Sequence, residues 1–116
     1  MTASACMGAL ARSWTNTRDQ LDEMQPGGEG FRELGAVLHA VESAITVTAP
    51  KSVVDYAIKV VVALGDGVLS EMQASMLIEA KRTMVEAGFR LPVCFEARSV
   101  GRGALPSATA GGSRDA

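Results

Sequence analysis

Aromatic residues are scarce in this chain of 116 residues, in which Phe, Trp and Tyr together make up 4%. Hydrophobic residues nevertheless make up 47% and charged residues 21%, which is ordinary for a globular protein. The core must therefore be built from aliphatic side chains and methionine. Sheet sandwiches usually contain more aromatic and threonine residues, so this composition favours helices packed on helices. The length allows one domain.

An excess of positive charge is also missing. The formal net charge is −2, so the chain has no electrostatic reason to approach nucleic acid or an acidic membrane surface. The charge is uneven, because residues 1–89 carry seven basic and eleven acidic side chains, whereas residues 90–116 carry four arginines and two acids. We expect a mildly acidic body and a mildly basic, solvated C-terminal segment.

The chain contains two cysteines and one histidine. Cys6 and Cys94 lie near opposite ends, and neither has a second Cys or His at the spacing of metal ligands. A disulfide between them stays open as an alternative, but two cysteines form no disulfide framework and indicate a reducing compartment. The N-terminus lacks the basic region of a signal peptide, and the longest apolar run, residues 60–64, is far shorter than the ~20 residues that cross a bilayer. We therefore expect a cytoplasmic protein without a membrane segment.

Two segments in the first half of the chain have the spacing of amphipathic helices. In residues 4–24 the apolar side chains lie three, four or seven residues apart, at Met7, Leu10, Trp14, Leu21 and Met24. The sequence QPGGEG ends this segment, because Pro and Gly cannot continue a helix. Residues 31–46 repeat the pattern, with apolar side chains at Phe31, Leu34, Leu38, Val41 and Ile45. The sequence predicts a helix over each range.

The stretch ITVTAPKSVVDYAIKV, residues 45–60, is rich in β-branched residues around one proline. Pro50 disfavours the α conformation for the residue before it, and Ser52 lies three residues before an aspartate, as in a capping box. A strand over residues 53–62 is the alternative, but it would have to bury two charged side chains or break its alternation. We predict a helix–loop–helix junction, with the next helix over residues 52–64.

The sequence GDG, residues 65–67, ends that helix. Apolar side chains then recur at helical spacing, and Gly88 is a natural C-terminal stop. A fourth helix is therefore predicted over residues 69–87. Apolar residues alternate in residues 89–97, which we expect to pack over the helices as an extended strap.

The C-terminal segment, residues 98–116, carries too few large apolar side chains to offset the entropy of ordering. We expect it to be disordered. The prediction as a whole is an all-α fold, with a small bundle of four helices in a domain of residues 1–97, followed by this tail.

A few polar residues could take part in chemistry: His39, Cys6, Cys94, Asp55 with Lys59, and Asp66. His39 lies on the polar face of its predicted helix, where a solvated side chain is the simpler interpretation. Cys6 lies in a first helical turn, whose dipole favours a thiolate, but near a chain end. Asp55 and Lys59 are four residues apart in the acid-first order, which predicts a helix cap and a surface ion pair. The sequence contains no phosphate-binding or metal-binding motif. We predict a protein that is not an enzyme and has no cofactor and no metal.

The helix over residues 52–64 is apolar on most of its circumference and must be covered on several sides. The fourth helix carries a row of methionines, for which a place in the core is the first interpretation and an adaptable binding surface is the alternative. We expect a bundle this small to leave part of this apolar surface in contact with water, and a second copy of the chain could bury it. The candidate interface therefore comprises Val54, Ile58, Val61, Val62, Met72, Met76 and Met84.

These observations favour a small non-enzymatic interaction or accessory protein, which forms a homodimer or binds another protein through an apolar helical surface. The alternative is a helix-turn-helix-type DNA-binding regulator. Its basic residues would be Lys81, Arg82 and Arg90, but Glu79 and Glu86 flank this cluster and offset its charge. Nucleic acid is therefore the less favoured partner.

The stretch LHAVESAITVTAPKSVVDYAIK, residues 38–59, resembles small uncharacterised bacterial proteins, some of them prophage-associated. Their pattern is an acidic helix that ends in E-x-x-I, then T-x-A or T-P-A, a Ser or Thr cap, and a D-x-x-x-K helix. The corresponding residues here are Glu42, Ile45, Thr48, Ala49, Ser52, Asp55 and Lys59. This chain departs from the pattern by placing Pro50 after the alanine. The resemblance implies a short cytoplasmic helical protein and assigns no activity.

Overall fold

The computed structural model of the protein describes residues 2–65 and 67–95. Its helices are α1 (Ala5–Glu23), α2 (Phe31–Val47), α3 (Val53–Leu64) and α4 (Glu71–Glu86). The predicted all-α fold is confirmed, and so is the helical interpretation of the β-branched stretch that becomes α3. Each predicted helix agrees with the observed one to within two residues at both ends. The predicted disordered tail, residues 98–116, lies outside the described residues, as does Asp66.

Side-chain caps fix where the last two helices begin. At the start of α3 the hydroxyl oxygen of Ser52 accepts a hydrogen bond from the backbone N–H of Asp55, at 3.1 Å. At the start of α4 Ser70 and Gln73 form a complete capping box, in which each side chain accepts a hydrogen bond from the backbone of the other. Such caps satisfy N–H groups that have no partner inside the helix.

Gly88 ends α4 with a φ angle of 95°, a left-handed conformation that favours glycine. The backbone N–H of Gly88 bonds the carbonyl of Val85 at 3.0 Å, and that of Phe89 bonds the carbonyl of Met84 at 3.0 Å. These two bonds are the Schellman motif, which turns the chain sharply at a helix end. The chain is thereby directed back toward α1.

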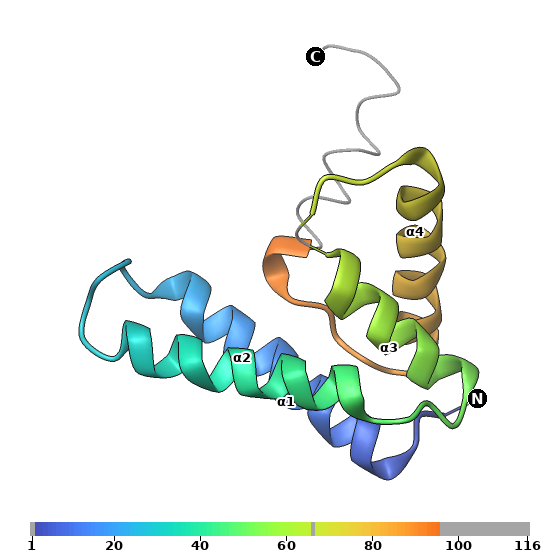
Figure 1. The fold of residues 1–116 in the computed structure, drawn as a ribbon, viewed down its shortest axis with the longest axis horizontal. Helices are drawn as coiled ribbons and strands as arrows, with labels where there is room; N and C mark the ends of the chain where they lie inside the picture. Colours follow the sequence, from blue (N-terminus) through green and yellow to red (C-terminus); the bar gives the residue numbers. More distant parts are fainter. Residues whose placement is uncertain (1, 66, 96–116) are drawn as a thin grey trace.

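The four helices form two hairpins (Figure 1). α1 packs along α2 and α3 packs along α4, and the α1–α2 pair lies across one end of the α3–α4 pair. Among the described helices, α3 packs against both α1 and α2. All Cα atoms of α4 lie more than 8 Å from those of α1 and α2. The hairpins therefore meet mainly through α3.

The core is mainly aliphatic, with two methionines, one Trp and one Phe, in keeping with the composition. Its members are Met7, Ala11, Trp14, Leu38, Ile45, Val54, Ala57, Ile58, Val61, Leu77, Ala80, Met84, Leu91 and Phe95. α3 supplies four of them, because α1, α2 and α4 all pack against it. The broad apolar face of α3 is thus covered largely by the chain itself.

We call residues 89–95 the strap. The expected alternation of an extended strap is not observed, because residues 93–95 form a helical turn. Leu91 and Phe95 are buried, as expected, but Val93 is 60% exposed and Phe89 is half-buried. The turn rotates Val93 away from the helices and brings Phe95 down into the core.

None of the described helices is long and apolar enough to span a membrane.

Candidate functional site

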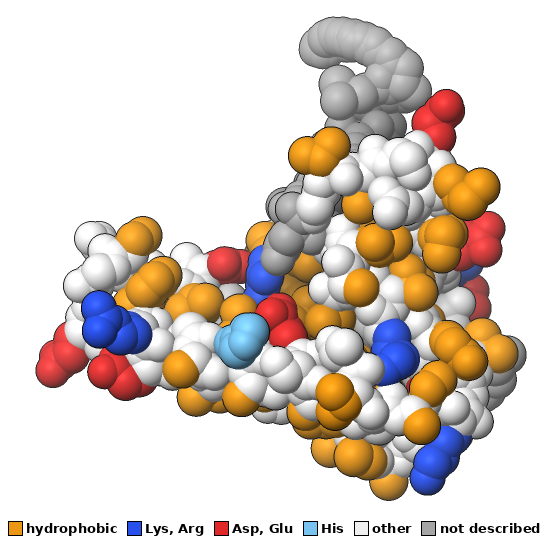
Figure 2. All heavy atoms as spheres, in the orientation of Figure 1, with side chains coloured by type: hydrophobic (Ala, Val, Ile, Leu, Met, Phe, Trp, Pro, Cys, Tyr) orange, Lys and Arg blue, Asp and Glu red, His pale blue; other side chains and the backbone are white. Residues whose placement is uncertain are grey.

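A group of apolar side chains remains accessible on one side of the α3–α4 pair. We call this group the seam surface, and it comprises Val53, Tyr56, Val60, Met72 and Met76. Met72 is 74% exposed and Tyr56 is 61% exposed, whereas Val60 is half-buried and also packs partly against the core. Figure 2 shows hydrophobic side chains distributed over α3 and α4.

Helical periodicity places these residues on the same side of the pair. A hollow of about 240 Å³ is lined by Val53 of α3 and Thr83 of α4, so these two residues mark one seam between the helices. Residues seven apart share one side of a helix. Val60 therefore lies on the side of Val53, and Met76 lies on the side of Thr83. Tyr56 lies one helical turn after Val53, and Met72 lies one turn before Met76, so both are on the same side as these residues.

The structure divides the predicted interface residues into two classes. Met72 and Met76 are exposed and belong to the seam surface. Val62 is half-buried and packs against the core, and the remaining four are buried by the chain itself: Val54, Ile58, Val61 and Met84. These four residues were expected at an interface, but they are buried by contacts within the chain and are not available to a partner.

Three residues of the seam surface, Val53, Tyr56 and Val60, are not among the interface residues predicted from the sequence. They are spaced three and four residues apart and form a second apolar stripe beside the buried stripe of α3. The signal for them is the same apolar circumference that indicated an interface on this helix. Which stripe would face the chain depended on the packing of α3 against the other helices.

Asp55 is buried and joins three segments of the chain. One carboxylate oxygen accepts the backbone N–H of Ser4 at 2.9 Å, and the other accepts that of Lys51 at 2.8 Å. Burial alone would raise the pKa of Asp55, but the hydrogen bonds from Lys51, Ser4 and Ser52 outweigh it, and the pKa lies below its ordinary value. The carboxylate fixes the N-terminus of α1 against the start of α3, which is a structural role.

Lys59 does not form the predicted surface ion pair with Asp55. Its ammonium group donates hydrogen bonds to the carbonyl oxygens of Ile45, Thr46 and Thr48, at 2.8, 2.7 and 2.8 Å. These carbonyls lie at the C-terminal end of α2, where a cation is stabilised by the helix dipole. The pairing fails because the carboxylate of Asp55 points to Ser4 and Lys51 instead.

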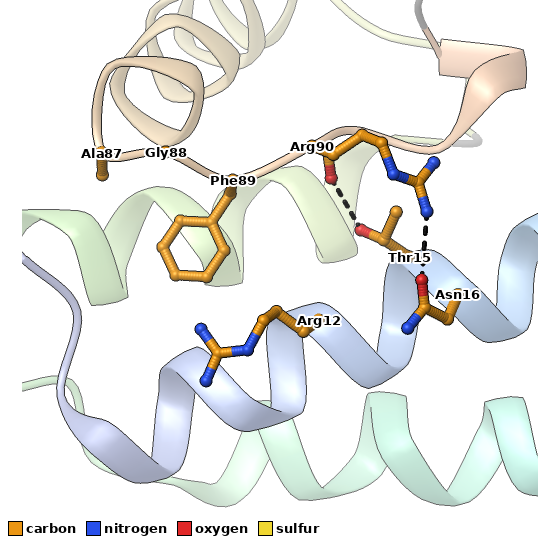
Figure 3. A pocket seen from close by; sticks show the side chains of 7 residues that line it. All are labelled: Arg12, Thr15, Asn16, Ala87, Gly88, Phe89 and Arg90. Carbon is orange, nitrogen blue, oxygen red and sulfur yellow. Dashed lines mark hydrogen bonds between the residues drawn. The ribbon is translucent and has the colours of Figure 1, made fainter.

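A hollow of about 260 Å³ lies between α1 and the end of α4 (Figure 3). Its lining consists of Arg12, Thr15, Asn16, Ala87, Gly88, Phe89 and Arg90. The guanidinium of Arg12 lies 5.9 Å from the centroid of the Phe89 ring, and Arg90 donates to the side-chain oxygen of Asn16 at 3.0 Å. The residues that line this hollow include no carboxylate, thiol or imidazole. Its one hydroxyl, that of Thr15, donates a hydrogen bond to the carbonyl oxygen of Arg90.

The remaining candidates for chemistry lie apart from one another. His39 and Cys6 are exposed, on α2 and α1. Cys94 is half-buried in the strap, and burial raises the pKa of its thiol, which disfavours the reactive thiolate. Both thiols are free. Within residues 2–65 and 67–95, no three His, Cys, Asp or Glu side chains are grouped closely enough to hold a metal ion.

The basic residues of the DNA-binding alternative do not share one face. The ammonium of Lys81 lies 5.4 Å from the centroid of the Phe95 ring, on the inner side of α4. Arg90 forms an ion pair with Asp19 of α1 and lies in the strap. Arg82 is exposed on α4, on a different side from Lys81. These three cations are therefore not clustered to contact a phosphate backbone together.

In comparisons with protein-family models, with curated proteins and with solved structures, nothing matches this chain.

Proposed function

We propose that the protein is a small non-enzymatic interaction protein that associates through the seam surface, with a second copy of itself as its partner. The observation that carries this proposal is the exposure of the apolar side chains along the α3–α4 seam. Val53, which lines the hollow at the seam, is 57% exposed, and Met76, which helical periodicity places on the same side of α4 as Thr83, is 46% exposed.

The physical motive is the hydrophobic effect. Removing apolar surface from water is favourable by roughly 25 cal/mol per Å², and single exposed apolar side chains need no explanation, whereas grouped ones indicate an interaction surface. Methionine and tyrosine suit such a surface, because methionine adapts its shape and tyrosine presents a large ring with a polar tip. The seam surface contains Met72, Met76 and Tyr56.

A second copy is the simplest partner for one apolar surface. In a two-fold dimer the same patch serves both subunits, so one self-complementary surface is sufficient. Tyr56 and Met72 would then meet apolar side chains of the same kind across the axis.

The test compares two double variants of the full chain. Met72→Ser with Met76→Ser removes two side chains from the seam surface. Ile78→Ser with Val85→Ser is the matched control, because these side chains are 53% and 55% exposed on the same helix but lie outside the seam surface.

We expect the wild type and the control to sediment as dimers in analytical ultracentrifugation, and the Met72/Met76 variant to shift toward monomer. Equal dissociation of both variants, or a monomeric wild type, would contradict the proposal. Circular dichroism of each variant checks that the helices are retained.

A further inference from the structure

The strap occupies the joint between the two helical hairpins. Among the described helices, α4 does not pack against α1 or α2, so α3 alone bridges the hairpins directly. The strap follows α4 and returns along α1, which makes it a second connection between the hairpins (Figure 1). It therefore joins parts of the fold that the helices themselves leave largely separate.

Polar groups hold the first part of the strap against α1. The hydroxyl of Thr15 donates to the carbonyl oxygen of Arg90 at 3.0 Å, and the N–H of Val93 donates to Oδ1 of Asp19 at 2.9 Å. The guanidinium of Arg90 also pairs with Asp19 and donates to Asn16. All three partners lie within five residues of one another on α1. Asp19 is the centre of this group, since it receives two of the bonds.

An aromatic side chain holds the last part of the strap. Phe95 is 1% exposed and contacts Trp14 edge-on, with 5.5 Å between the ring centroids. Its ring occupies the space above Gly65 at the end of α3, where an added Cβ would lie 2.3 Å from it. Arg18 of α1 lies over the ring at 5.3 Å, and Lys81 of α4 at 5.4 Å. Phe95 thus touches α1, the end of α3 and α4 at once.

The strap is held by polar contacts to α1 and by the buried side chains of Leu91, Pro92 and Phe95. Within residues 89–95 the N–H of Phe95 donates a backbone hydrogen bond to the carbonyl oxygen of Pro92. The side chain of Arg90 is 53% exposed, so water competes with Asp19 for its guanidinium, whereas Asp19 itself is 18% exposed. Gly88, whose left-handed conformation ends α4, provides a boundary at which the chain can change direction. Local opening of such segments requires less free energy than global unfolding.

We propose that the strap is a releasable segment that links the two hairpins. In the closed form it fixes the α1–α2 hairpin to the α3–α4 hairpin. In the open form residues 89–95 leave the joint together, while each hairpin keeps its own packing. Opening exposes Trp14 and the surface around Gly65 that the Phe95 ring covers in the closed form. It therefore creates a second apolar surface. The proposal is independent of the proposed function, because the strap and the seam surface share no residue.

Hydrogen exchange of the wild-type chain, followed by NMR at increasing low concentrations of denaturant, tests this directly. We expect the amides of Val93 and Phe95 to exchange at least about tenfold faster than those of Trp14 and Ile58, with a weaker dependence on denaturant, as for a sub-global opening. Val93 and Phe95 should share one opening free energy. If they exchange at the rate and with the denaturant dependence of the helix amides, the strap unfolds only with the whole domain and the proposal is wrong.

A pair of variants tests whether the strap moves as a unit. Asp19→Ala removes the acceptor of Val93 and Arg90, and Glu23→Ala is the control, an exposed acid at the end of the same helix. We expect Asp19→Ala to speed exchange at both Val93 and Phe95 by roughly tenfold, since bonds to a charged acceptor are lost, with the amide of Ile58 unchanged. Acceleration at Val93 alone would contradict the proposal, because Phe95 would then be held independently of Asp19.

Discussion

The ring of Phe95 meets the indole of Trp14 edge-on, with the ring planes 80° apart and the centroids separated by 5.5 Å. Edge-to-face pairs of this kind contribute about 0.5–1.5 kcal/mol beyond the area they bury. The contact joins the first helix to the last described residue of the chain. The indole N–H of Trp14 donates in turn to Glu42 of α2 at 3.0 Å, so the same side chain connects the strap to the α1–α2 hairpin.

Truncation of Phe95 should be among the most costly single changes. Phe95→Ala removes a fully buried ring from the joint, and we expect a loss of about 3–5 kcal/mol in the free energy of unfolding, measured by urea denaturation. Phe89→Ala is the control, because the Phe89 ring is half-buried and lies over a hollow. A loss at Phe89 equal to that at Phe95 would contradict the central position of Phe95.

The close approach of Phe95 to Gly65 makes a second prediction. In Gly65→Ala the new methyl group would lie 2.3 Å from the Phe95 ring and 2.8 Å from the carbonyl oxygen of Val61. We expect a destabilisation of about 1–3 kcal/mol from overpacking. Gly35→Ala in α2 is the control, because nothing lies within 4 Å of its new methyl group. There the gain in helix propensity should stabilise the protein by about 0.5–1 kcal/mol, and thermal unfolding of both variants measures the difference in sign.

Stability should fall in acid through Asp55 and Asp19. Burial would raise the pKa of Asp19, but hydrogen bonds from Arg90 and Val93 outweigh it, so the pKa values of both carboxyls lie below their ordinary range when folded. Such a group stabilises the fold fully above its unfolded pKa of about 3.9, and the contribution disappears as the pH falls through the lower folded value.

Asp55→Asn tests the contribution of Asp55, the more deeply buried of the two carboxyls. At neutral pH we expect a loss of about 1.5–3 kcal/mol, because two N–H groups lose a charged acceptor, and a smaller further loss in acid than the wild type shows. Urea denaturation between about pH 7 and about pH 3 gives both quantities. Glu29→Gln, an exposed acid in the α1–α2 turn, is the control. A pH dependence of Asp55→Asn equal to that of the wild type would contradict this account.

Lys59 should contribute to stability as a cap of α2. Lys59→Met keeps an apolar chain of similar length but leaves the carbonyls of Ile45, Thr46 and Thr48 without its ammonium group. We expect a loss of about 1–2 kcal/mol, whereas Lys51→Met, at an exposed position, should be nearly neutral. Chemical denaturation of the two variants makes the comparison. If the two lysines prove equivalent, the observed bonds of Lys59 do not stabilise the helix end.

Local features of the sequence were sufficient to predict the helices and their ends. The apolar spacing, Ser70 with Gln73, Ser52 and Gly88 all act within a few residues of their own position, so their effect can be read along the chain. Long-range contacts could not be derived in the same way. Ser4 meets Asp55 and Thr15 meets the backbone of Arg90 because the hairpins cross, and periodicity alone does not contain that crossing.

The candidate interface, too, was only partly predictable from local features of the sequence. Periodicity indicated that α3 and α4 carry more apolar surface than a small core needs, but it could not decide which methionines of α4 would be buried. Met84 is buried, whereas Met72 and Met76 are exposed. Periodicity also could not decide which stripe of α3 would face inward, since Val54 and Val53 are adjacent and differ only in which neighbour covers them. The helical turn at Val93 and the burial of Phe95 likewise depend on space above Gly65 that exists only in the assembled fold.

The molar mass of the purified wild-type protein in solution decides whether the chain self-associates. It is measured by multi-angle light scattering behind a size-exclusion column, under reducing conditions that keep Cys6 and Cys94 from forming intermolecular disulfides. Association through the seam surface predicts twice the chain mass of 12.1 kDa, with dissociation on dilution. A mass of one chain at every concentration would contradict self-association and leave the exposed residues of α3 and α4 without the partner proposed for them.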